Sequence, residues 1–409
     1  MIDFNRLSST EREKNILMIL DHIIEAGETS AIDTANKTGL STATVSRAMA
    51  LLKQKELVIE TGKEITDMGR HPGIFSINPK FGYLLYFHLG SSYLTSYLAD
   101  FSGTQLRMLK TKIDRSITIQ EFCAKLRESA DTLAQEQHIR YEDVYVAGIS
   151  IPGLADEQNH VVKRIPNFTN FNNENMFMYA CDALHMPVVI HNEARLGVVG
   201  EYITHFKNYR NLIYLDFTNY SGIGAGIILN GALYSGKNGF AGEIGDMLMD
   251  LHGFYGSNRE DEGCLEAMAG VGVMMDRLTT LMRRGRANIL KEILIAENAK
   301  TPTLEHIERA VLMQDLDVMD VFDETMKMWA VAAVNLAAML DPDVLLLGGV
   351  VDAKNDVVLA RINHYVSKIL YYDLDIRLSK SHAQAQYSGG IHLTKKYAFN
   401  NILAHRIFQ

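Results

Sequence analysis

A glycine-rich stretch in the middle of the chain constrains the possible folds more than any other feature of the sequence. It covers residues 221–246 and reads SGIGAGIILNGALYSGKNGFAGEIGD. Eight of the 24 residues from Gly222 to Gly245 are glycine, against 30 in the whole chain. Glycine tolerates positive φ and lets a backbone approach a ligand closely. The stretch is therefore a candidate for a tight turn that faces a ligand.

The residues around these glycines predict strands on both sides. The apolar runs 211–217 and 226–229 indicate two strands, and Asn230-Gly231 is typical of a hairpin turn. We therefore expect residues 222–226 to form a tight turn between strands. No helix pattern follows, so this is not the setting of a dinucleotide-binding fingerprint. The alternative is a β-hairpin that needs glycine for its geometry only.

Several further motifs occur in an order that resembles the ROK family, which groups sugar-responsive repressors with sugar kinases. Besides the glycine-rich stretch, the matching segments are ISIPG at 149–153, HNEA at 191–194, GCLE at 263–266, and DPD at 341–343 followed by the apolar strand and glycine pair at 344–349. The resemblance implies an α/β fold with a two-lobed, actin-like, sugar-kinase-like domain.

Length and composition are those of an ordinary globular protein with more than one domain. The chain has 409 residues, of which 47% are hydrophobic and 22% charged. Three widely separated cysteines argue against a disulfide framework and suit a reducing, cytoplasmic location. The N-terminus lacks the apolar core of a signal peptide, and the apolar run 329–340 is too short to span a bilayer. We therefore expect no membrane segment.

The first 60 residues have the pattern of a helix-turn-helix. Apolar spacing predicts helices at 12–25, at 30–38 with Ile32 and Ala35 facing inward, and from Ser41 or Thr42 to about residue 55. The glycine-containing turn 39–41 joins the last two. In this motif the later helix enters the major groove of DNA.

The outer face of the third helix has the side chains that suit DNA. From residue 41 to residue 55 there are three basic residues and no acidic one, although the net charge of the chain is −9. Small hydroxyls and one arginine can reach phosphates and base edges. The candidate DNA-binding residues on this helix are Ser41, Thr42, Thr44, Ser46 and Arg47. The alternative is a three-helix module that binds protein.

Two short runs after these helices predict the strands of a wing. The runs are 57–60 and 73–77, and Arg70 lies between them. The Gly-Arg-X-Pro segment around Arg70 resembles the wing tip of ROK repressors, where an arginine can enter a narrow minor groove. The alternative is a solvent-exposed turn without DNA contact.

Three positions depart from the pattern of the ROK kinases. The first strand of those kinases ends in an aspartate that binds the metal and orients the phosphates. This chain has His88 at that position. A histidine cannot replace a carboxylate as a hard Mg²⁺ ligand. Tyr220 occupies a glycine position, where its side chain would obstruct a phosphate cradle. Glu193 replaces the aspartate that serves as general base, and its extra methylene can spoil the geometry of proton transfer. The resemblance therefore does not extend to phosphoryl transfer.

The zinc motif of the family is also incomplete. Asp246 stands at the histidine position, Ser257 and Arg259 stand at two cysteine positions, and only Cys264 remains. One thiolate and one carboxylate do not make a structural zinc site. We therefore expect no metal and no cofactor.

The family's sugar contacts map onto a set of amides and carboxylates. Groups of this kind pair with several hydroxyls at once, which a polyol requires. The residues at the matching positions, together with the acidic residue beside them, are Asn167, Asn192, Glu193, Glu243, Asp246 and Glu266. For Asn192 and Glu193 the alternative is capping of a helix at 194–202.

These observations favour a transcriptional regulator, with repression as the expected activity. We expect a winged helix-turn-helix at 1–80, a first lobe at 81–190 completed by a C-terminal helix at 388–409, and a second lobe at 191–387. The expected partners are operator DNA and a sugar or sugar phosphate. We also expect a homodimer or homotetramer, since operators usually have two-fold symmetry. The alternatives are a ROK-type kinase that phosphorylates a hexose with ATP, and a scaffold that binds neither ligand.

Overall fold

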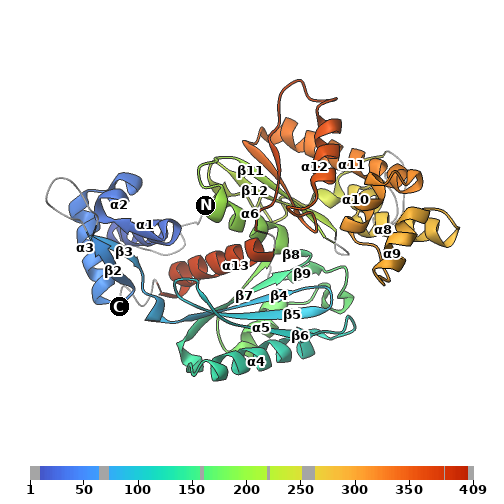
Figure 1. Cartoon of the computed structure of the whole chain (residues 1–409). Helices are drawn as coiled ribbons and strands as arrows, with labels where there is room; N and C mark the ends of the chain where they lie inside the picture. The colour runs from blue at the N-terminus through green and yellow to red at the C-terminus, as the bar shows by residue number, and fades with distance from the viewer. Residues whose placement is uncertain are drawn as a thin grey trace.

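The molecule consists of an N-terminal helical domain and two α/β parts (Figure 1). The structure is a computed structural model and describes residues 10–63, 73–156, 161–218, 222–250, 263–381 and 383–403. Each α/β part is built on its own five-stranded sheet. This arrangement confirms the predicted fold class, a winged helix-turn-helix joined to a two-lobed α/β domain.

The N-terminal domain is a winged helix. It contains α1 (Glu11–Ala26), α2 (Ala31–Thr38) and α3 (Thr42–Gln54), with a small antiparallel sheet of β1 (Glu28–Ser30), β3 (Gly73–Ile77) and β2 (Val58–Lys63). The side chains of Thr10, Ser30 and Ser41 accept hydrogen bonds from backbone N–H groups and start the three helices. The predicted helices and wing strands are therefore confirmed. Arg70 lies outside the described residues.

One prediction about α2 is wrong. Ile32 does not face inward, because 49% of its surface is exposed. Thr34 and Ala35 are the buried residues of this helix, and the Thr34 hydroxyl donates to the Ser30 carbonyl at 2.8 Å. Ile32 lies two residues before Thr34, about 200° around the helix, and so on its opposite side.

The first α/β part has a mixed sheet with the order β10-β7-β4-β5-β6. Its strands are β4 (Tyr83–Leu89), β5 (Tyr93–Asp100), β6 (Gln105–Lys112), β7 (Val144–Ile151) and β10 (Val188–Asn192). One face packs on α4 (Ile119–Glu136) and α5 (Met176–Leu184), through residues such as Phe87 and Ile149. The opposite face carries Tyr86 and Val146 and packs on the C-terminal helix. A hairpin of β8 (Leu154–Asp156) and β9 (Val161–Arg164) follows β7.

The second α/β part has a sheet with the order β13-β12-β11-β14-β15. Its strands are β11 (Leu212–Phe217), β12 (Ile223–Leu229), β13 (Ala232–Leu233), β14 (Val344–Gly349) and β15 (Ile376–Leu378). Its outer helices are α7 (Leu265–Ala269), α8 (Val271–Arg283), α9 (Asn288–Ala296), α10 (Leu304–Leu312), α11 (Leu316–Leu340) and α12 (Asp356–Val366).

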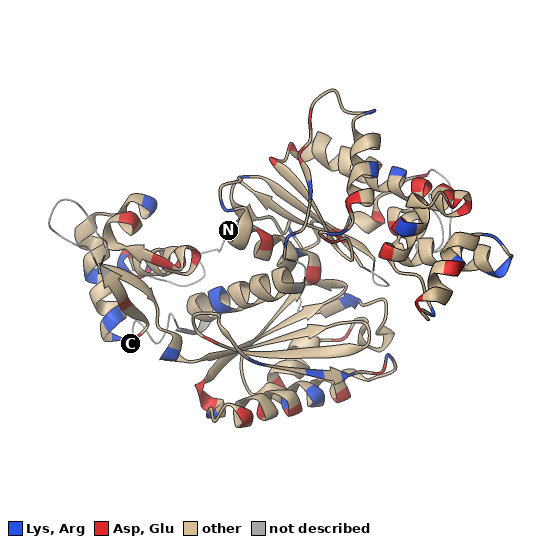
Figure 2. Ribbon diagram, viewed as in Figure 1, with Lys and Arg blue, Asp and Glu red and all other residues tan. Residues whose placement is uncertain are grey.

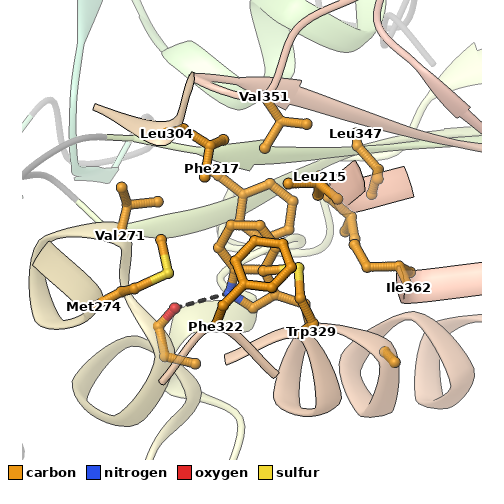
Figure 3. Packing of buried hydrophobic residues seen from close by; sticks show 14 of the residues in the cluster. Leu215, Phe217, Val271, Met274, Leu304, Phe322, Trp329, Leu347, Val351 and Ile362 are labelled. Atoms are coloured by element: carbon orange, nitrogen blue, oxygen red, sulfur yellow. Dashed lines mark hydrogen bonds between the residues drawn. The ribbon is translucent and has the colours of Figure 1, made fainter. Parts of the chain in front are cut away.

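The core of the second part is centred on the chain's single tryptophan. Trp329 of α11 stacks on Phe217 at the end of β11, with ring centroids 3.8 Å apart (Figure 3). Its indole N–H donates to the Ala269 carbonyl at 2.8 Å, so this buried polar group is satisfied. The tryptophan thus joins α11 to the end of β11 and to α7, both of which border the cavity described below.

The prediction of a tight turn at residues 222–226 is wrong. β12 already starts at Ile223, so Gly224 and Gly226 belong to the strand and do not form a turn. Gly226 is required because a Cβ there would lie 2.3 Å from the Ala194 carbonyl oxygen of the helix packed on the strand. The hairpin turn at Asn230-Gly231 is confirmed, since both residues have positive φ, 52° and 77°.

Two central helices lie between the sheets. They are α6 (Glu193–His205) and α13 (Ala383–Tyr397), and α13 continues into a π-helix over Ala398–Leu403. The C-terminal helix therefore begins earlier than the predicted 388, and residues 404–409 lie outside the description. Gly200 and Gly389 allow close packing, because a Cβ at either position would come within 2.0 Å of a carbonyl oxygen of the other helix. No helix in the described ranges has the length and apolar character to cross a membrane.

Candidate functional site

A cavity of about 380 Å³ lies between the two α/β parts. The segment after β9 forms one wall, and the second part supplies the rest from the end of β11 to the start of α8. The lining residues are Arg164, Ile165, Pro166, Thr169, Asn172, Thr218, Gly222, Asp246, Cys264, Glu266, Ala267, Gly270, Val271, Gly272 and Val273. The cavity thus combines hydroxyl, amide, carboxylate and guanidinium groups with an apolar wall, as ligand sites commonly do.

Asp246 and Glu266 reach this cavity from two short helices that are held together. Asp246 ends a 3₁₀ turn over Ile244–Asp246, and Glu266 is the second residue of α7. The backbone N–H of Leu265 donates to the Met247 carbonyl at 2.8 Å, which joins the two segments. Both residues were predicted to contact the ligand, and the structure brings them to one cavity.

Gly222 makes room for the Glu266 carboxylate. A Cβ on Gly222 would lie 2.2 Å from Oε2 of Glu266, and one on Gly245 would lie 2.7 Å from the same atom. Gly222 also has φ of +117°, a conformation that L side chains rarely adopt. Gly222, the first glycine of the stretch, therefore leaves space for the Glu266 carboxylate in the cavity. Its role is not limited to the geometry of a hairpin.

Burial shifts the carboxyl groups beside the cavity toward the protonated form. The pKa of Glu243 is raised to about 7, mainly by burial, while the nearby Arg195 partly offsets the shift. The pKa of Glu266 is also raised by burial, and Arg164, whose Nη2 lies 4.0 Å from Oε1 of Glu266, works in the opposite direction. Near neutral pH the Glu243 carboxyl group is thus present in both forms and can donate to or accept from a hydroxyl.

The two predicted asparagines have different environments. Asn192 caps α6: its Oδ1 accepts from the Ala194 N–H at 2.8 Å, and its Nδ2 donates to the Gly153 carbonyl at 2.9 Å. The capping alternative is therefore what the structure shows for Asn192, and a ligand contact there stays a prediction. The Nδ2 group of Asn167 is buried and has no hydrogen-bond partner in the described part of the chain.

Glu193 lies with buried Asp216 and partly buried His88 and does not line the cavity. Its Oε1 is 3.6 Å from Nδ1 of His88, at the end of β4, and Asp216 on β11 is close enough to interact electrostatically. Burial lowers the pKa of His88 to about 4 and raises the pKa of Asp216 to about 7. The pKa of Glu193 is raised well above its usual range by burial and by Asp216. Lys110 also acts electrostatically on His88 and lowers its pKa further.

The incomplete zinc motif falls partly outside the structure. Tyr220, Ser257 and Arg259 lie outside the described residues, whereas Cys264 and Asp246 both line the cavity. Within the described ranges, no group of three or more His, Cys, Asp or Glu side chains is placed to hold a metal ion. The expectation of no metal stays a prediction.

Some cavity residues were missed from the sequence. Arg164 ends β9, Thr169 and Asn172 come from the polar segment that follows it, and all three line the cavity opposite the second part. The Oδ1 atom of Asn172 accepts from the Ile165 N–H at 2.9 Å, which fixes the loop. A clue was present, because three asparagines and a threonine crowd positions 167–172.

The second candidate site is the exposed face of α3. Ser41, Thr42, Ser46 and Arg47 are exposed, and Thr44 is half-buried. The hydroxyls of Ser41 and Thr44 lie 2.9 Å apart, so both serve the helix start. Figure 2 shows that α3 carries basic and no acidic side chains.

A shallow cavity between α1 and α3 adds a residue that the sequence analysis missed. Arg12 of α1 and Arg47 of α3 both line it, together with Thr44 and Asn15. Two arginines from the first and the last helix of the motif thus lie along one groove. First-helix residues of such motifs commonly meet the DNA backbone.

The chain belongs to the ROK family, which its residues 88–396 match. Residues 12–59 match a winged helix-turn-helix DNA-binding domain. Among similar proteins is the xylose repressor of Bacillus spizizenii, 30% identical over 282 residues, which are 66% of this chain and 69% of the relative. A putative xylose repressor of Caldicellulosiruptor is 24% identical over 385 residues, 90% of this chain and 92% of the relative.

The fold also matches a solved structure over nearly its whole length. That structure is a ROK family transcriptional regulator, a homolog of the Escherichia coli Mlc protein. The TM-score is 0.78 at 22% identity, covering 97% of this chain and 98% of the other. The likeness shows that the winged helix and both α/β parts occur together in this order in another chain.

Proposed function

We propose that this protein is a sugar-responsive transcriptional repressor. The main observation is that one chain combines a winged helix and a ROK domain. The third helix of the winged helix has basic and no acidic residues, and the cavity of the ROK domain is lined by groups that can hydrogen-bond to hydroxyls. The relatives named xylose repressors support this proposal. The proposed division is a DNA-binding domain at 1–80, a first lobe at 81–190 completed by the C-terminal helix that starts at Ala383, and a second lobe from 191 up to that helix.

The charges around the cavity favour an uncharged sugar over a sugar phosphate. Asp246 and Glu266 line it and Glu243 is nearby, whereas Arg164 is the one basic residue among the described lining residues. Arg164 already lies 4.0 Å from the Glu266 carboxylate. A phosphate would therefore meet carboxylates that repel it, while the hydroxyls of a neutral sugar would find donors and acceptors. D-xylose is the first probe, because the relatives carry its name.

The rival function is a sugar kinase. Phosphoryl transfer needs a hard-metal carboxylate and groups that neutralise phosphate charge. His88 stands at the position of the kinase aspartate. Its side chain is uncharged at neutral pH and lies near the carboxyl groups of Glu193 and Asp216. We therefore propose that the ROK domain binds its sugar without ATP, metal or other cofactor, in a cytoplasmic protein that acts as a homodimer or homotetramer on two-fold operator DNA.

The test combines two measurements on the full chain. Thermal shift is measured with D-xylose, D-glucose and their phosphates, and fluorescence anisotropy follows binding to DNA from upstream of the protein's own gene. We expect one uncharged sugar to raise the melting temperature and to weaken DNA binding. ATP-dependent phosphorylation of that sugar at about 1 per second or faster would instead establish the kinase.

A further inference from the structure

The first helix of the DNA-binding domain is held by the C-terminal helix of the sugar-binding domain. Nζ of Lys396 on α13 lies 2.8 Å from Oε1 of Glu25 and 3.0 Å from Oδ1 of Asp21, both on α1. The Lys396 side chain is 18% exposed, Asp21 is 25% exposed and Glu25 is 49% exposed, so the pair with Asp21 is better shielded from water than the pair with Glu25. Shielded pairs are screened less by salt than exposed ones, and removing one partner leaves a buried charge.

The other central helix reaches the same residue of α1. Lys207 follows the end of α6, and its Nζ donates to the backbone carbonyl of Glu25 at 2.6 Å. Glu25 is therefore held by its side chain from α13 and by its backbone from the end of α6. A displacement of either helix changes a contact at one point on α1.

The opposite end of α6 starts at the cleft between the α/β parts. Asn192 caps this end, and Glu193 is the first helical residue, 3.6 Å from His88. The helix is 13 residues long, about 20 Å, and Lys207 lies two residues beyond its last residue. One helix thus runs from the cluster of His88, Glu193 and Asp216, where the two α/β parts meet, to the DNA-binding domain.

The two central helices form one packed unit. Besides the glycine contacts, the fully buried carboxylate of Glu201 on α6 accepts from the Ser379 hydroxyl at 2.5 Å and from the Lys380 and Ser381 N–H groups at 2.9 Å. These donors precede α13 directly. Packed helices move as a rigid pair because their contacts do not deform continuously.

The hydrophobic core of the DNA-binding domain continues into the same unit. A single buried cluster contains Ile19 and Leu20 of α1, Leu196 of α6, Ile391 of α13, and Phe399 just beyond it. The winged helix is therefore docked on the ROK domain through a packed face and is not tethered by a loose linker alone (Figure 1).

We propose that Lys396 and Lys207 are positioning residues that transmit sugar binding to the winged helix by setting the place of α1 through Glu25 and Asp21. The inference rests on the proposed function, and it assigns the coupling to a specific contact. Closing the cleft moves the start of α6, the α6–α13 pair moves as one body, and α1 is carried to a position in which α3 of each copy no longer matches its half-site.

The experiment compares the full chain with the Lys396→Met variant, using D-xylose as the sugar. Three quantities are measured: sugar affinity by Trp329 fluorescence, DNA affinity by anisotropy with and without sugar, and hydrogen exchange of α1 amides. In the wild type we expect sugar to weaken DNA binding by about tenfold or more and to change exchange in α1. In the variant we expect sugar affinity within about twofold of wild type and most of the effect on DNA and α1 to be lost.

Two further variants keep the test decisive. Lys368→Met removes an exposed lysine two residues after the end of α12, away from α1, and should respond as the wild type does. If Lys396→Met folds poorly, Glu25→Gln carries the test, since its side chain is 49% exposed and its loss leaves α1 intact. The conservative variant Lys396→Arg keeps a positive charge toward both Glu25 and Asp21 and should keep most of the response to sugar.

The possible failures are distinguishable. If the wild type responds to D-xylose and both Lys396→Met and Glu25→Gln respond equally, the coupling role is overturned while the proposed function stands. If the wild type binds DNA but neither D-xylose nor any other sugar changes its melting temperature, the proposed function fails and the coupling falls with it.

Discussion

Nδ1 of His88 lies 3.6 Å from Oε1 of Glu193, and the two side chains come from β4 and from the first residue of α6. The distance exceeds that of a hydrogen bond. Burial lowers the pKa of His88 to about 4, so the imidazole is uncharged at neutral pH and the contact is not an ion pair, while burial and Asp216 raise the pKa of Glu193. The two side chains stand at the positions that the family resemblance matches to the metal-binding and base aspartates of the kinases.

The His88 environment predicts a specific dependence of stability on pH. A histidine whose pKa is about 4 in the folded state and 6.5 when unfolded binds more protons in the unfolded chain between these values. Its contribution to the free energy of unfolding is therefore complete above pH 6.5 and lost as pH falls toward 4, by about 3 kcal/mol at most. His88→Gln should lose less stability than the wild type between pH 7 and pH 5. Urea unfolding at both pH values is the measurement, and equal losses in both proteins would contradict it.

The fold could be predicted from the sequence where periodicity decides the structure. The bounds of α1, α2 and β3 agree within one residue with those predicted from helical spacing and apolar runs. The requirement for Gly226 could not be predicted, because the atom that excludes a Cβ there, the Ala194 carbonyl oxygen, belongs to a helix packed on the strand. Ile32 was misplaced because the hydrogen-bonded Thr34, not the apolar side chain, faces the core.

The site was predictable only in part, for a related reason. Asp246 and Glu266 were found through the family resemblance, and both line the cavity. Arg164 and Asn172 were missed, because only the tertiary fold places the segment after β9 opposite α7. For Asn192 the structure shows hydrogen bonds of its amide to the start of α6 and to Gly153, and a ligand contact there stays a prediction.

Arg47 is expected to contribute to DNA binding. It is exposed on α3 beside Arg12 of α1, in a groove that carries both guanidinium groups. Arg47→Ala should weaken binding by about 1–3 kcal/mol if the side chain reads a base edge, and Arg12→Ala should weaken it less and reduce the salt dependence. Anisotropy titrations on upstream DNA at two salt concentrations measure both effects. Lys291→Ala, an exposed change on α9, is the control and should bind as the wild type.

Phe217 is expected to be a major contributor to the stability of the second lobe. It is 1% exposed and stacks on Trp329, whose emission reports the state of this core. Phe217→Ala should lower the free energy of unfolding by about 3–5 kcal/mol, because it removes a large buried ring and leaves a cavity. Urea unfolding followed by Trp329 fluorescence gives the value. A loss below about 1 kcal/mol would mean that the core collapses around the gap.

Glu243 and Glu266 are expected to determine sugar binding. Glu266 lines the cavity beside Gly222, and the Glu243 carboxyl, with its pKa of about 7, can donate to a sugar hydroxyl at neutral pH. Glu243→Ala and Glu266→Ala should each abolish the thermal shift from the best sugar while DNA binding stays intact. Glu292→Ala, an exposed acidic residue on α9, should keep the shift. If both cavity variants are still stabilised by sugar as the wild type is, the sugar binds elsewhere, and the role carried over from the family is wrong at these two positions.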